Sequence, residues 1–580
     1  MAVVGIDLGT TNSRVATYID GKSVLIPNIY NEFFTPSVVS INDDGEVLVG
    51  KIAKERLITN PDLSTSLFKR DMGTDKKVKL GKKLLLPEEL SSFVLRQLFE
   101  DAKNFMGEPV TEAIVSVPAY FNANQRAATK RAGLLSGVNV ERLINEPSAA
   151  ALACRQDKDE TFVVFDFGGG TLDVSIVEAF DNIINICAIS GNNFLGGADF
   201  DHMIAEAICA ENGIDASSLP KQEFQTLLRV SEDAKIRLSD EDNVKVSVIL
   251  NNKEISYIVN NNLLIQLSKG ILERLKRPIQ LAMRDSDLSA SDIDKCILIG
   301  GSCQMPIVRD YLHDLLRVPI SDSHDANKMV ALGLGIYVGI KQRNPDVKDL
   351  VLTDICPFSL NTNVHNEHNP NKQLSFTMIP RNAPLPSSKT QPFWTIKTGQ
   401  TKIIMQISQG EQIYAEDNVV LGDLAVRVPY NRKTNEQINM TFSYDINAIL
   451  AVEIEVVSTG IRSSLILTGD GLEFSEKEIQ KSIQNIKDLT LAHLERTELL
   501  LERAKRIYTE SNELLKNHIT DIILALENLI SGGSIRKKNT TLDAIEDYLK
   551  ELERNLEYSD IFNEPAFLKV IKGGVAESDE

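Results

Sequence analysis

Two short acidic segments that contain glycine constrain the fold of this chain more than any other feature of its sequence. Residues 7–11 read DLGTT, and residues 166–171 read DFGGGT. Each follows an apolar run, VVGI before the first and FVVF before the second, that is typical of a buried strand. Each is followed by alternating residues, SRVA and LDVS, that predict the returning strand of a hairpin. The sequence therefore predicts two equivalent strand–turn–strand units.

A turn of this composition can bind phosphate. Its glycines leave backbone N–H groups open to phosphate oxygens, and its carboxylate can hold a metal ion. Two such turns that face each other would contact a nucleotide from both sides. One copy alone is explained as well by an ordinary tight hairpin, because Asp and Gly are common turn residues. The repetition of the pattern, with threonine in both copies, favours the phosphate site.

Composition narrows the class of protein. The chain has 580 residues, which is more than one core usually serves, so we expect two to four domains. A net charge of −19 argues against nonspecific binding to nucleic acid or to anionic membranes. The six cysteines include no C-x-x-C pair, which is typical of reduced thiols rather than of disulfides or a zinc site. The start of the chain does not resemble a signal peptide, and no apolar run approaches the ~20 residues of a membrane span. We expect a cytoplasmic protein.

Four regions follow one another along the chain. Residues 1–346 alternate strand-like and helix-like segments, as in an α/β domain. Residues 347–354 form an apolar segment bounded by acids, which suggests an interdomain linker that docks onto another part of the protein. Residues 355–470 have the strand pattern and the Pro and Gly punctuation of a β-sandwich. Residues 471–580 are predicted to be a helical lid and a short tail, with one helical pattern continuing to residue 530. The predicted fold class is multidomain: α/β, then all-β, then α.

Longer motifs suggest a family. They are GIDLGTTNS (5–13), VPAYFN (117–122), INEPSAA (144–150), LGGADFD (195–201), IPRN (379–382) and QGE (409–411). With these strings in this order, the chain resembles the seventy-kilodalton heat-shock chaperones of the DnaK type over nearly its whole length. The resemblance implies an actin-like ATPase domain, a β-sandwich that binds extended apolar peptide segments, and a helical lid. It also implies that ATP favours peptide exchange and that hydrolysis traps the peptide.

The resemblance assigns roles at the phosphate end of the site. Asp7 and Asp166 would hold a hydrated Mg²⁺, and Lys69 would lie near the γ-phosphate of ATP and the attacking water. Glu146 and Asp173 would complete the carboxylate cluster. The residues that would surround the phosphates are Gly9, Thr10, Thr11, Asn12, Gly168, Gly169, Gly170, Gly196 and Gly197, with Thr171 at the γ-phosphate. Positioning and charge suffice for phosphoryl transfer, so no covalent nucleophile is required.

The adenosine end departs from the family pattern. The matching residues are Glu232, Lys235, Ser239, Gly300, Gly301, Ser302 and Gln304. The family usually has an arginine that stacks on the base where this chain has Gln304. Because an amide lacks the cation–π contact of a guanidinium, we expect adenine to be held less tightly.

The remaining implied roles concern communication between domains. Pro118, Arg126 and the linker residue Asp354 would relay the nucleotide state to the peptide-binding domain. Arg142 and Asn145 match the surface that meets J-domain co-chaperones.

The peptide pocket is the most altered part of the pattern. The aligned residues are Thr362, Val364, His365, Phe393, Ile396, Ile403 and Met405. His365 and Ile396 stand where Met and Ala are usual, and Ile403 is bulkier than the usual Val. A smaller pocket and a specialised range of clients are therefore predicted.

The chain lacks residues between about 51 and 87 that longer members have, and in this it is most like the short bacterial paralogue HscC. Expected partners are segments of unfolded proteins and a J-domain protein, with the exchange factor left open. We expect a mainly monomeric protein without nucleic-acid or membrane partners.

Two alternative functions stay open. One is a chaperone-like regulator that binds ATP as a structural ligand, and Gln304 keeps it open. The other is a metabolite kinase on the same duplicated fold, which leaves the β and helical regions unexplained.

Overall fold

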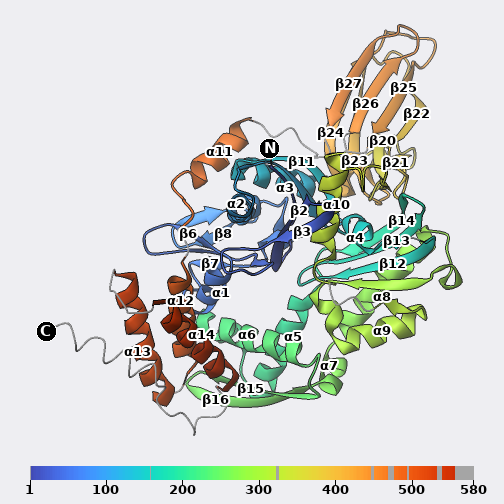
Figure 1. The fold of residues 1–580 in the computed structure, drawn as a ribbon. Coiled ribbons are helices and arrows are strands. Elements are labelled where there is room, and N and C mark those ends of the chain that lie inside the picture. Colours follow the sequence, from blue (N-terminus) through green and yellow to red (C-terminus); the bar gives the residue numbers. More distant parts are fainter. Residues whose placement is uncertain are drawn as a thin grey trace.

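The computed structural model describes residues 2–156, 158–321, 326–445, 450–467, 476–492, 495–511, 513–531 and 538–555. An α/β body, from β1 to α10, carries a projecting arm of strands, β20 to β27 (Figure 1). Helices α12 to α14 lie on the side of the body away from the arm, and α11 lies on the body beside α2 and α3 (Figure 1); α11 to α14 are called the lid helices below. The predicted tail after residue 555 lies outside the described residues.

The body is built on two six-stranded sheets of equivalent design. In the first, β1 (Ala2–Asp7) pairs in parallel with β10 (Val110–Val117) and antiparallel with β2 (Asn12–Ile19). In the second, β12 (Glu160–Phe167) pairs in parallel with β17 (Lys295–Ile299) and antiparallel with β13 (Leu172–Phe180). The two hairpins predicted from the repeated motif are confirmed. The remaining strands are β3 (Lys22–Ile26), β4 (Thr35–Pro36) and β11 (Asn139–Asn145) in the first sheet, and β14 (Ile183–Asn192), β18 (Ile320–Ser321) and β19 (Val351–Thr353) in the second.

Two helices join the sheets into one body. Residues of both sheets share a buried apolar cluster with α4 (Glu146–Cys154) and α10 (Met329–Lys341). The helices touch so closely that a Cβ on Gly333 would lie 1.7 Å from the carbonyl oxygen of Ala149. Because the helices fix the sheets, the two acidic turns are held at opposite sides of one opening.

Further elements surround the two sheets. The helices are α1 (Lys51–Thr59), α2 (Pro87–Met106), α3 (Ala123–Ser136), α5 (Gly197–Glu211), α6 (Lys221–Arg237), α7 (Asn261–Leu267), α8 (Lys269–Asp285) and α9 (Pro306–Leu316). The strands are β5 (Val39–Ile41), β6 (Val47–Val49), β7 (Ser64–Thr65), β8 (Val78–Leu80), β9 (Lys83–Leu85), β15 (Asn243–Leu250) and β16 (Lys253–Asn260). Helices α1 and α6 approach each other at the opening between the two halves of the body, where Lys54 of α1 pairs with Glu232 of α6.

The segment expected to be a linker is docked. Its strand β19 pairs in parallel with β14, with Val351 opposite Ile183. Its residues Val347 and Leu352 pack against the apolar cluster that joins the two sheets, whereas Val351 keeps 51% of its surface exposed.

The arm is a sandwich of two four-stranded sheets. One sheet has the order β21-β20-β23-β24, and the other has the order β22-β25-β26-β27. The strands are β20 (Leu360–Val364), β21 (Leu374–Ile379), β22 (Ser387–Trp394), β23 (Lys402–Gln409), β24 (Val419–Arg427), β25 (Gln437–Tyr444), β26 (Leu450–Val456) and β27 (Arg462–Leu467). Alternating side chains of both sheets form one buried apolar cluster, which is the packing expected of strands with period-two polarity.

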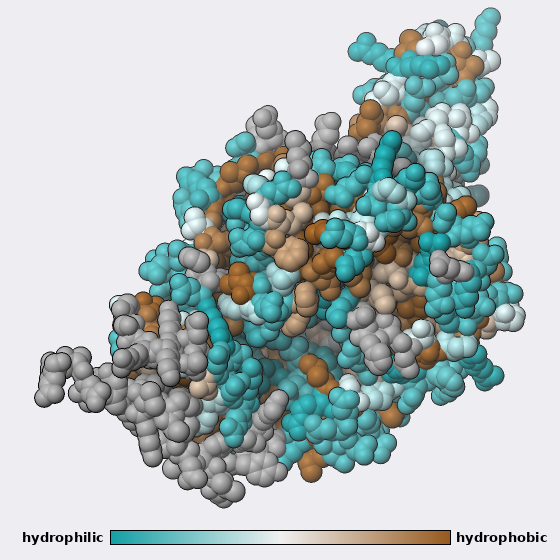
Figure 2. All heavy atoms as spheres, in the orientation of Figure 1, coloured by the Kyte–Doolittle hydropathy of each residue, from teal (hydrophilic) through white to brown (hydrophobic). Residues whose placement is uncertain are grey.

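The base of the arm contacts the body directly. Arg381 forms an ion pair of 2.5 Å with Asp285 of α8. The backbone N–H of Ala123, at the start of α3, donates to Oε1 of Gln409 over 2.8 Å. On the face shown in Figure 2, hydrophobic residues gather on the body beside this base, and hydrophilic residues cover most of the rest.

The prediction of one helical pattern continuing to residue 530 is wrong. The lid helices are α11 (Glu476–Ile486), α12 (Arg496–Glu510), α13 (Glu513–Ile530) and α14 (Lys538–Asn555). The chain leaves α11 because Thr490 and Ala492 exchange backbone hydrogen bonds of 2.7 and 2.9 Å with Val47 at the edge strand β6. Ile486 and Leu489 enter the apolar core of the body, and this tertiary contact overrides the helical periodicity.

Candidate functional site

A cavity of about 300 Å³ lies between the two acidic turns. The predicted site residues that line it are Asp7, Gly9, Thr10, Thr11, Asn12, Lys69, Glu146, Asp166, Gly168, Gly169, Thr171, Glu232, Lys235, Ser239, Gly300, Gly301, Ser302 and Gln304. Four other predicted residues, Gly170, Asp173, Gly196 and Gly197, are not among its lining residues. The fold therefore gathers most of the predicted phosphate and adenosine residues around one space.

The two turns face each other in close contact. A Cβ on Gly169 would lie 2.3 Å from Cγ2 of Thr11, and one on Gly170 would lie 2.3 Å from Cγ2 of Thr10. No side chain fits at either position, so the glycines allow this approach. Gly196 extends the same packing, because its Cβ would lie 2.4 Å from the backbone of Gly169. Gly170 thus permits the contact between the two turns, and Gly196 permits the approach of the next segment to the second turn.

Carboxylates crowd the deep end of the cavity. Lys69 Nζ donates to Oε1 of Glu146 over 2.8 Å, and both side chains are almost fully buried. Asp7 accepts a hydrogen bond of 3.3 Å from Ser116. Burial raises the pKa of Asp7 and that of Glu146, although the charges of Arg14 and Lys69 oppose the shift at Asp7 and the charge of Lys69 opposes it at Glu146. The pKa of Asp166 is raised well above its usual range, by burial and by the charges of its carboxylate neighbours.

Asp173 lies buried beneath this end. Its Oδ1 accepts a hydrogen bond of 3.2 Å from the backbone N–H of Tyr120, and its Oδ2 has no hydrogen-bond partner among the described residues. Burial and the charge of Glu146 raise its pKa to about 8. The ring of Tyr120 in turn contacts the ring of Phe358 at the base of the arm, with centroids 4.7 Å apart. Asp173 is therefore two contacts away from the arm.

The other end of the cavity combines two helices with a glycine turn. Lys235 Nζ donates to the carbonyl oxygen of Gly197 over 3.0 Å and forms an ion pair of 2.7 Å with Asp201. Ser302 Oγ donates to the carbonyl oxygen of Gly168 over 2.8 Å, which ties this end to the second acidic turn. Gly300 has φ of 84° beside the backbone of Phe167, a conformation that favours glycine. Gln304 lines the cavity with an exposed side chain.

Sequence reasoning did not single out several residues that the structure places at this site. Arg14 and Asp201 line the cavity. Arg70 braces the second turn, since its Nε donates to the carbonyl oxygen of Gly170 over 3.0 Å and its Nη2 pairs with Asp199 at 2.7 Å. The sequence shows only that Arg14 is the one charged residue of β2, and its place opposite Asp7 is seen in the structure.

The residues predicted to connect the domains also come together. Asn145 Nδ2 donates to both carboxylate oxygens of Asp354 over 3.0 Å, and Arg126 donates to Oδ1 of Asn145. Burial raises the pKa of Asp354, although the charges of Arg126 and Arg142 lower it. Pro118 accepts a backbone hydrogen bond of 3.1 Å from Phe121, at the turn that leads into α3. The docked linker is thus anchored by its acidic end.

The predicted peptide residues divide into two groups. Thr362, Ile403 and Met405 are buried in the sandwich, and Val364 and Phe393 are half-buried. The ring of Phe393 meets that of Phe376 edge-on. His365 and Ile396 are exposed, and Ile396 retains 54% of its accessible surface. The binding roles of all seven residues stay predictions.

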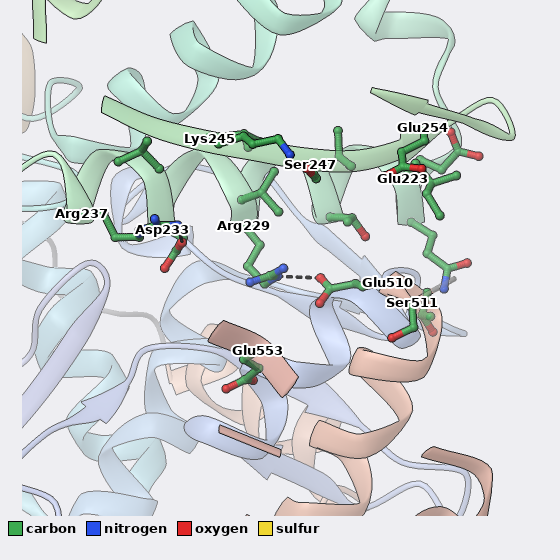
Figure 3. A pocket seen from close by; sticks show the side chains of 18 of the residues that line it. Glu223, Arg229, Asp233, Arg237, Lys245, Ser247, Glu254, Glu510, Ser511 and Glu553 are labelled. Atoms are coloured by element: carbon green, nitrogen blue, oxygen red, sulfur yellow. Dashed lines mark hydrogen bonds and ion pairs between the residues drawn. The ribbon is translucent and has the colours of Figure 1, made fainter. Parts of the chain in front are cut away.

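A second, larger cavity of about 860 Å³ lies between α6, β15 and the lid helices. Figure 3 shows charged side chains of α6 above it and those of the lid below, with the ion pair of 2.6 Å between Arg229 and Glu510 crossing it. None of the predicted site residues lines this cavity. Its importance is structural, because it marks where the lid meets the body.

Comparison with known proteins gives a consistent result. The profile of a family described as Hsp70 protein matches residues 3–564. A chaperone protein DnaK of Thermotoga petrophila is 35% identical, and the alignment covers 96% of this chain and 93% of that protein. A chaperone protein DnaK of Methanothermobacter thermautotrophicus is 34% identical over 95% of this chain and 96% of that protein. A chaperone protein DnaK of Thermosipho melanesiensis is 37% identical over 84% of this chain and 83% of that protein. No helix among the described residues is long and apolar enough to cross a membrane.

Proposed function

We infer, from the premise that this chain belongs to the Hsp70 family and is an ATP-dependent molecular chaperone, that the cavity between the two acidic turns is its ATPase site. The family binds ATP and ADP, usually with Mg²⁺. In our proposal, residues 1–346 form an actin-like ATPase domain, residues 347–354 the linker, residues 355–470 the sandwich that binds peptide, and residues 471–580 the lid and tail. Residues 9–12 and 168–171 would contact the phosphates from opposite sides.

The carboxylates suit a hydrated magnesium ion. Among the described residues, no three acidic, histidine or cysteine side chains converge closely enough to hold a metal directly. Asp7 and Asp166 nevertheless line the same cavity, and burial raises the pKa of both, so a cation would stabilise their charged forms. Mg²⁺ prefers oxygen ligands and keeps several waters. When bound there, it would neutralise charge on the phosphates.

The protein's own residues would position the reacting groups. Lys69, held by Glu146, would place its ammonium group beside the γ-phosphate, where negative charge develops during transfer. Glu146 would orient Lys69 and accept a hydrogen bond from the attacking water. Thr171 would donate a hydrogen bond to the γ-phosphate. The buried position of this end would exclude other water and strengthen each of these interactions.

Coupling to the peptide domain would use the contacts at the base of the arm. A change at Asp173 would reach Phe358 through Tyr120, and a change in the turn at Pro118 would reach Gln409 through the start of α3. The docked linker and the arm–body contacts would hold the two regions together in one state and release them in the other. Arg142 and Asn145, beside the linker, would bind the J-domain partner.

The sandwich would bind extended apolar segments of unfolded proteins against Phe393, Ile403 and Met405. A specialised client range is a proposal that rests on His365, Ile396 and Ile403, and a particular likeness to HscC is a proposal that rests on the residues missing between about 51 and 87. The relatives reported above are named DnaK, which does not discriminate between these subgroups.

The observation that carries this proposal is the buried Lys69–Glu146 pair at the junction of the two turns. Single-turnover ATP hydrolysis should be measured for the full chain and for Lys69→Ala, each with and without an apolar peptide and a J-domain. Lys103→Ala, which alters an exposed lysine of α2, is the control. We expect peptide-stimulated hydrolysis that is lost only in the Lys69 variant. Hydrolysis absent from the wild-type protein, or undiminished in Lys69→Ala, would contradict the proposed site.

A further inference from the structure

Arg14 differs from the other cations at the nucleotide cavity. It stands on β2 opposite Asp7, lines the cavity and keeps only 15% of its side-chain surface exposed. Its Nη1 forms a long ion pair of 3.9 Å with Oδ2 of Asp7, a separation beyond hydrogen-bond distance. The ring of Phe34 holds the guanidinium from one side, 5.9 Å from the ring centroid.

The neighbouring cations are already engaged. Lys69 pairs with Glu146 at 2.8 Å, Lys235 with Asp201 at 2.7 Å and Arg70 with Asp199 at 2.7 Å. Across the described residues, no side-chain hydrogen bond is made by the guanidinium of Arg14. An arginine stays charged at any physiological pH and carries five N–H donors. A buried guanidinium without such bonds has donors left for an anionic ligand.

The carboxylates give this charge its importance. Asp7, Glu146 and Asp166 line the phosphate end of the cavity, and the one lysine there is engaged by Glu146. A nucleotide adds further negative charge to this space. Without another cation, the phosphates and these carboxylates repel one another at short range in a partly desolvated site.

We propose that Arg14 is a built-in cation of the nucleotide site, which lets the phosphates bind without a divalent metal and weakens the hold of the site on Mg²⁺. This inference rests on the proposed ATPase site. The guanidinium offsets the charge of Asp7 and donates to a phosphate oxygen. Since it also repels a divalent ion beside Asp7, it lowers the affinity of the nucleotide complex for Mg²⁺.

Binding of ADP to the full chain, measured by calorimetry in EDTA and in saturating Mg²⁺, tests the proposal. Arg14→Gln removes the charge and keeps much of the shape, whereas Arg14→Lys keeps the charge. Arg237→Gln, at a half-buried position of α6 that does not line the nucleotide cavity, is the matched control. In EDTA we expect Arg14→Gln to bind ADP at least about tenfold more weakly than the wild type, and Arg14→Lys to stay within about threefold. In saturating Mg²⁺, Arg14→Gln should lose no more than about threefold.

The affinity of the ADP complex for Mg²⁺ is a second readout, and the loss of the charge should increase it rather than decrease it. In the ADP complex, the Mg²⁺ concentration at half-saturation should fall severalfold in Arg14→Gln, because a repelling charge is gone. A merely structural role for Arg14 predicts weaker binding of both ligands, and that result would overturn the proposal. So would equal ADP affinity of wild type and Arg14→Gln in EDTA. Arg14→Met, which also removes the charge, repeats the test if the glutamine variant folds poorly. Failure of the wild type to bind ADP in Mg²⁺ would instead contradict the ATPase site itself.

Discussion

Two clusters of buried charge, one where the lid helices meet α1 and one at the phosphate end of the nucleotide cavity, differ in how their charges are balanced. At the lid, Arg506 is surrounded by Glu55, Glu510 and Glu553, and Arg503 also pairs with Glu553. Burial there lowers the pKa of Arg506, yet the three carboxylates outweigh it and raise the pKa well above its usual range. At Glu553 burial acts to raise the pKa, but the hydrogen bonds and charges of Arg503 and Arg506 outweigh burial, so the pKa is lowered.

The phosphate end of the cavity shows the reverse. Burial raises the pKa values of its carboxylates, Asp7, Glu146, Asp166 and Asp173, and repulsion by neighbouring carboxylates adds to the rise at the last three. The nearby cations oppose these shifts without cancelling them. The lid cluster is thus electrostatically complete in the protein alone, whereas the phosphate cluster keeps carboxylate charge that, in our proposal, a bound cation would compensate. Charge that is satisfied internally is typical of a structural contact, and charge that is not is typical of a functional site.

Removing the central cation of the phosphate cluster should have the largest effect. In Lys69→Ala we expect the rate of ATP hydrolysis to fall about 10³-fold, or ~4 kcal/mol in activation free energy, because the developing charge loses its nearest cation. ADP affinity should change far less. If ADP affinity fell as much as the rate of hydrolysis, Lys69 would stabilise the bound nucleotide rather than the transition state. Its role would then be a binding contact and not a catalytic one.

Removing the central cation of the lid cluster should act on structure instead. Arg506→Ala removes the partner of the buried Glu55 and one of the two arginine partners of Glu510, which should cost about 3 kcal/mol. This loss of stability should make amide exchange in α12 roughly 100-fold faster, as measured by hydrogen exchange and mass spectrometry. Arg496→Ala, which breaks a partly exposed pair with Glu546, is the control and should cost under about 1 kcal/mol. Unchanged exchange in Arg506→Ala would remove the distinction between the two clusters.

The two clusters also differ in how far the sequence predicts them. Asp7 and Asp166 each belong to a strand, a turn and a returning strand that are contiguous in the chain, so local patterns place both. The lid cluster joins Glu55 to Arg506 across hundreds of residues, and no local periodicity indicates such a pair. The break after α11 has the same origin, since it depends on the backbone of Val47. Arg14 was missed because a single charged residue in a strand does not reveal which face it occupies.

The pH dependence of stability tests the comparison through a smaller expected effect. The pKa of Asp173 is about 8 in the folded protein and 3.8 as the ordinary value, so the folded state binds the extra proton between these limits. Its stabilising contribution is therefore complete below about pH 4 and is lost as the pH rises through 8. Without nucleotide, the body should lose about 2 kcal/mol of stability between pH 6 and pH 8.

Thermal unfolding of the wild type and of Asp173→Asn, followed across this pH range, measures the loss. The asparagine keeps an acceptor for the N–H of Tyr120 and cannot ionise, so its melting temperature should depend less on pH. Parallel curves for the two proteins would mean that Asp173 does not titrate in this range, and that the phosphate cluster is better compensated than its geometry indicates.

The smallest effect is expected at the adenosine end, where neither kind of cluster exists. Gln304 lines the cavity with an exposed amide, and it offers the base no charge to stack on. Gln304→Arg should add a cation–π contact of about 1 kcal/mol and tighten ADP binding about fivefold, with little change for inorganic phosphate. Calorimetry with both ligands separates the two cases. If phosphate binding rose as much as ADP binding, the new arginine would be acting as a general positive charge on the carboxylate-rich end. The adenosine end would then be electrostatically part of the phosphate cluster rather than independent of it.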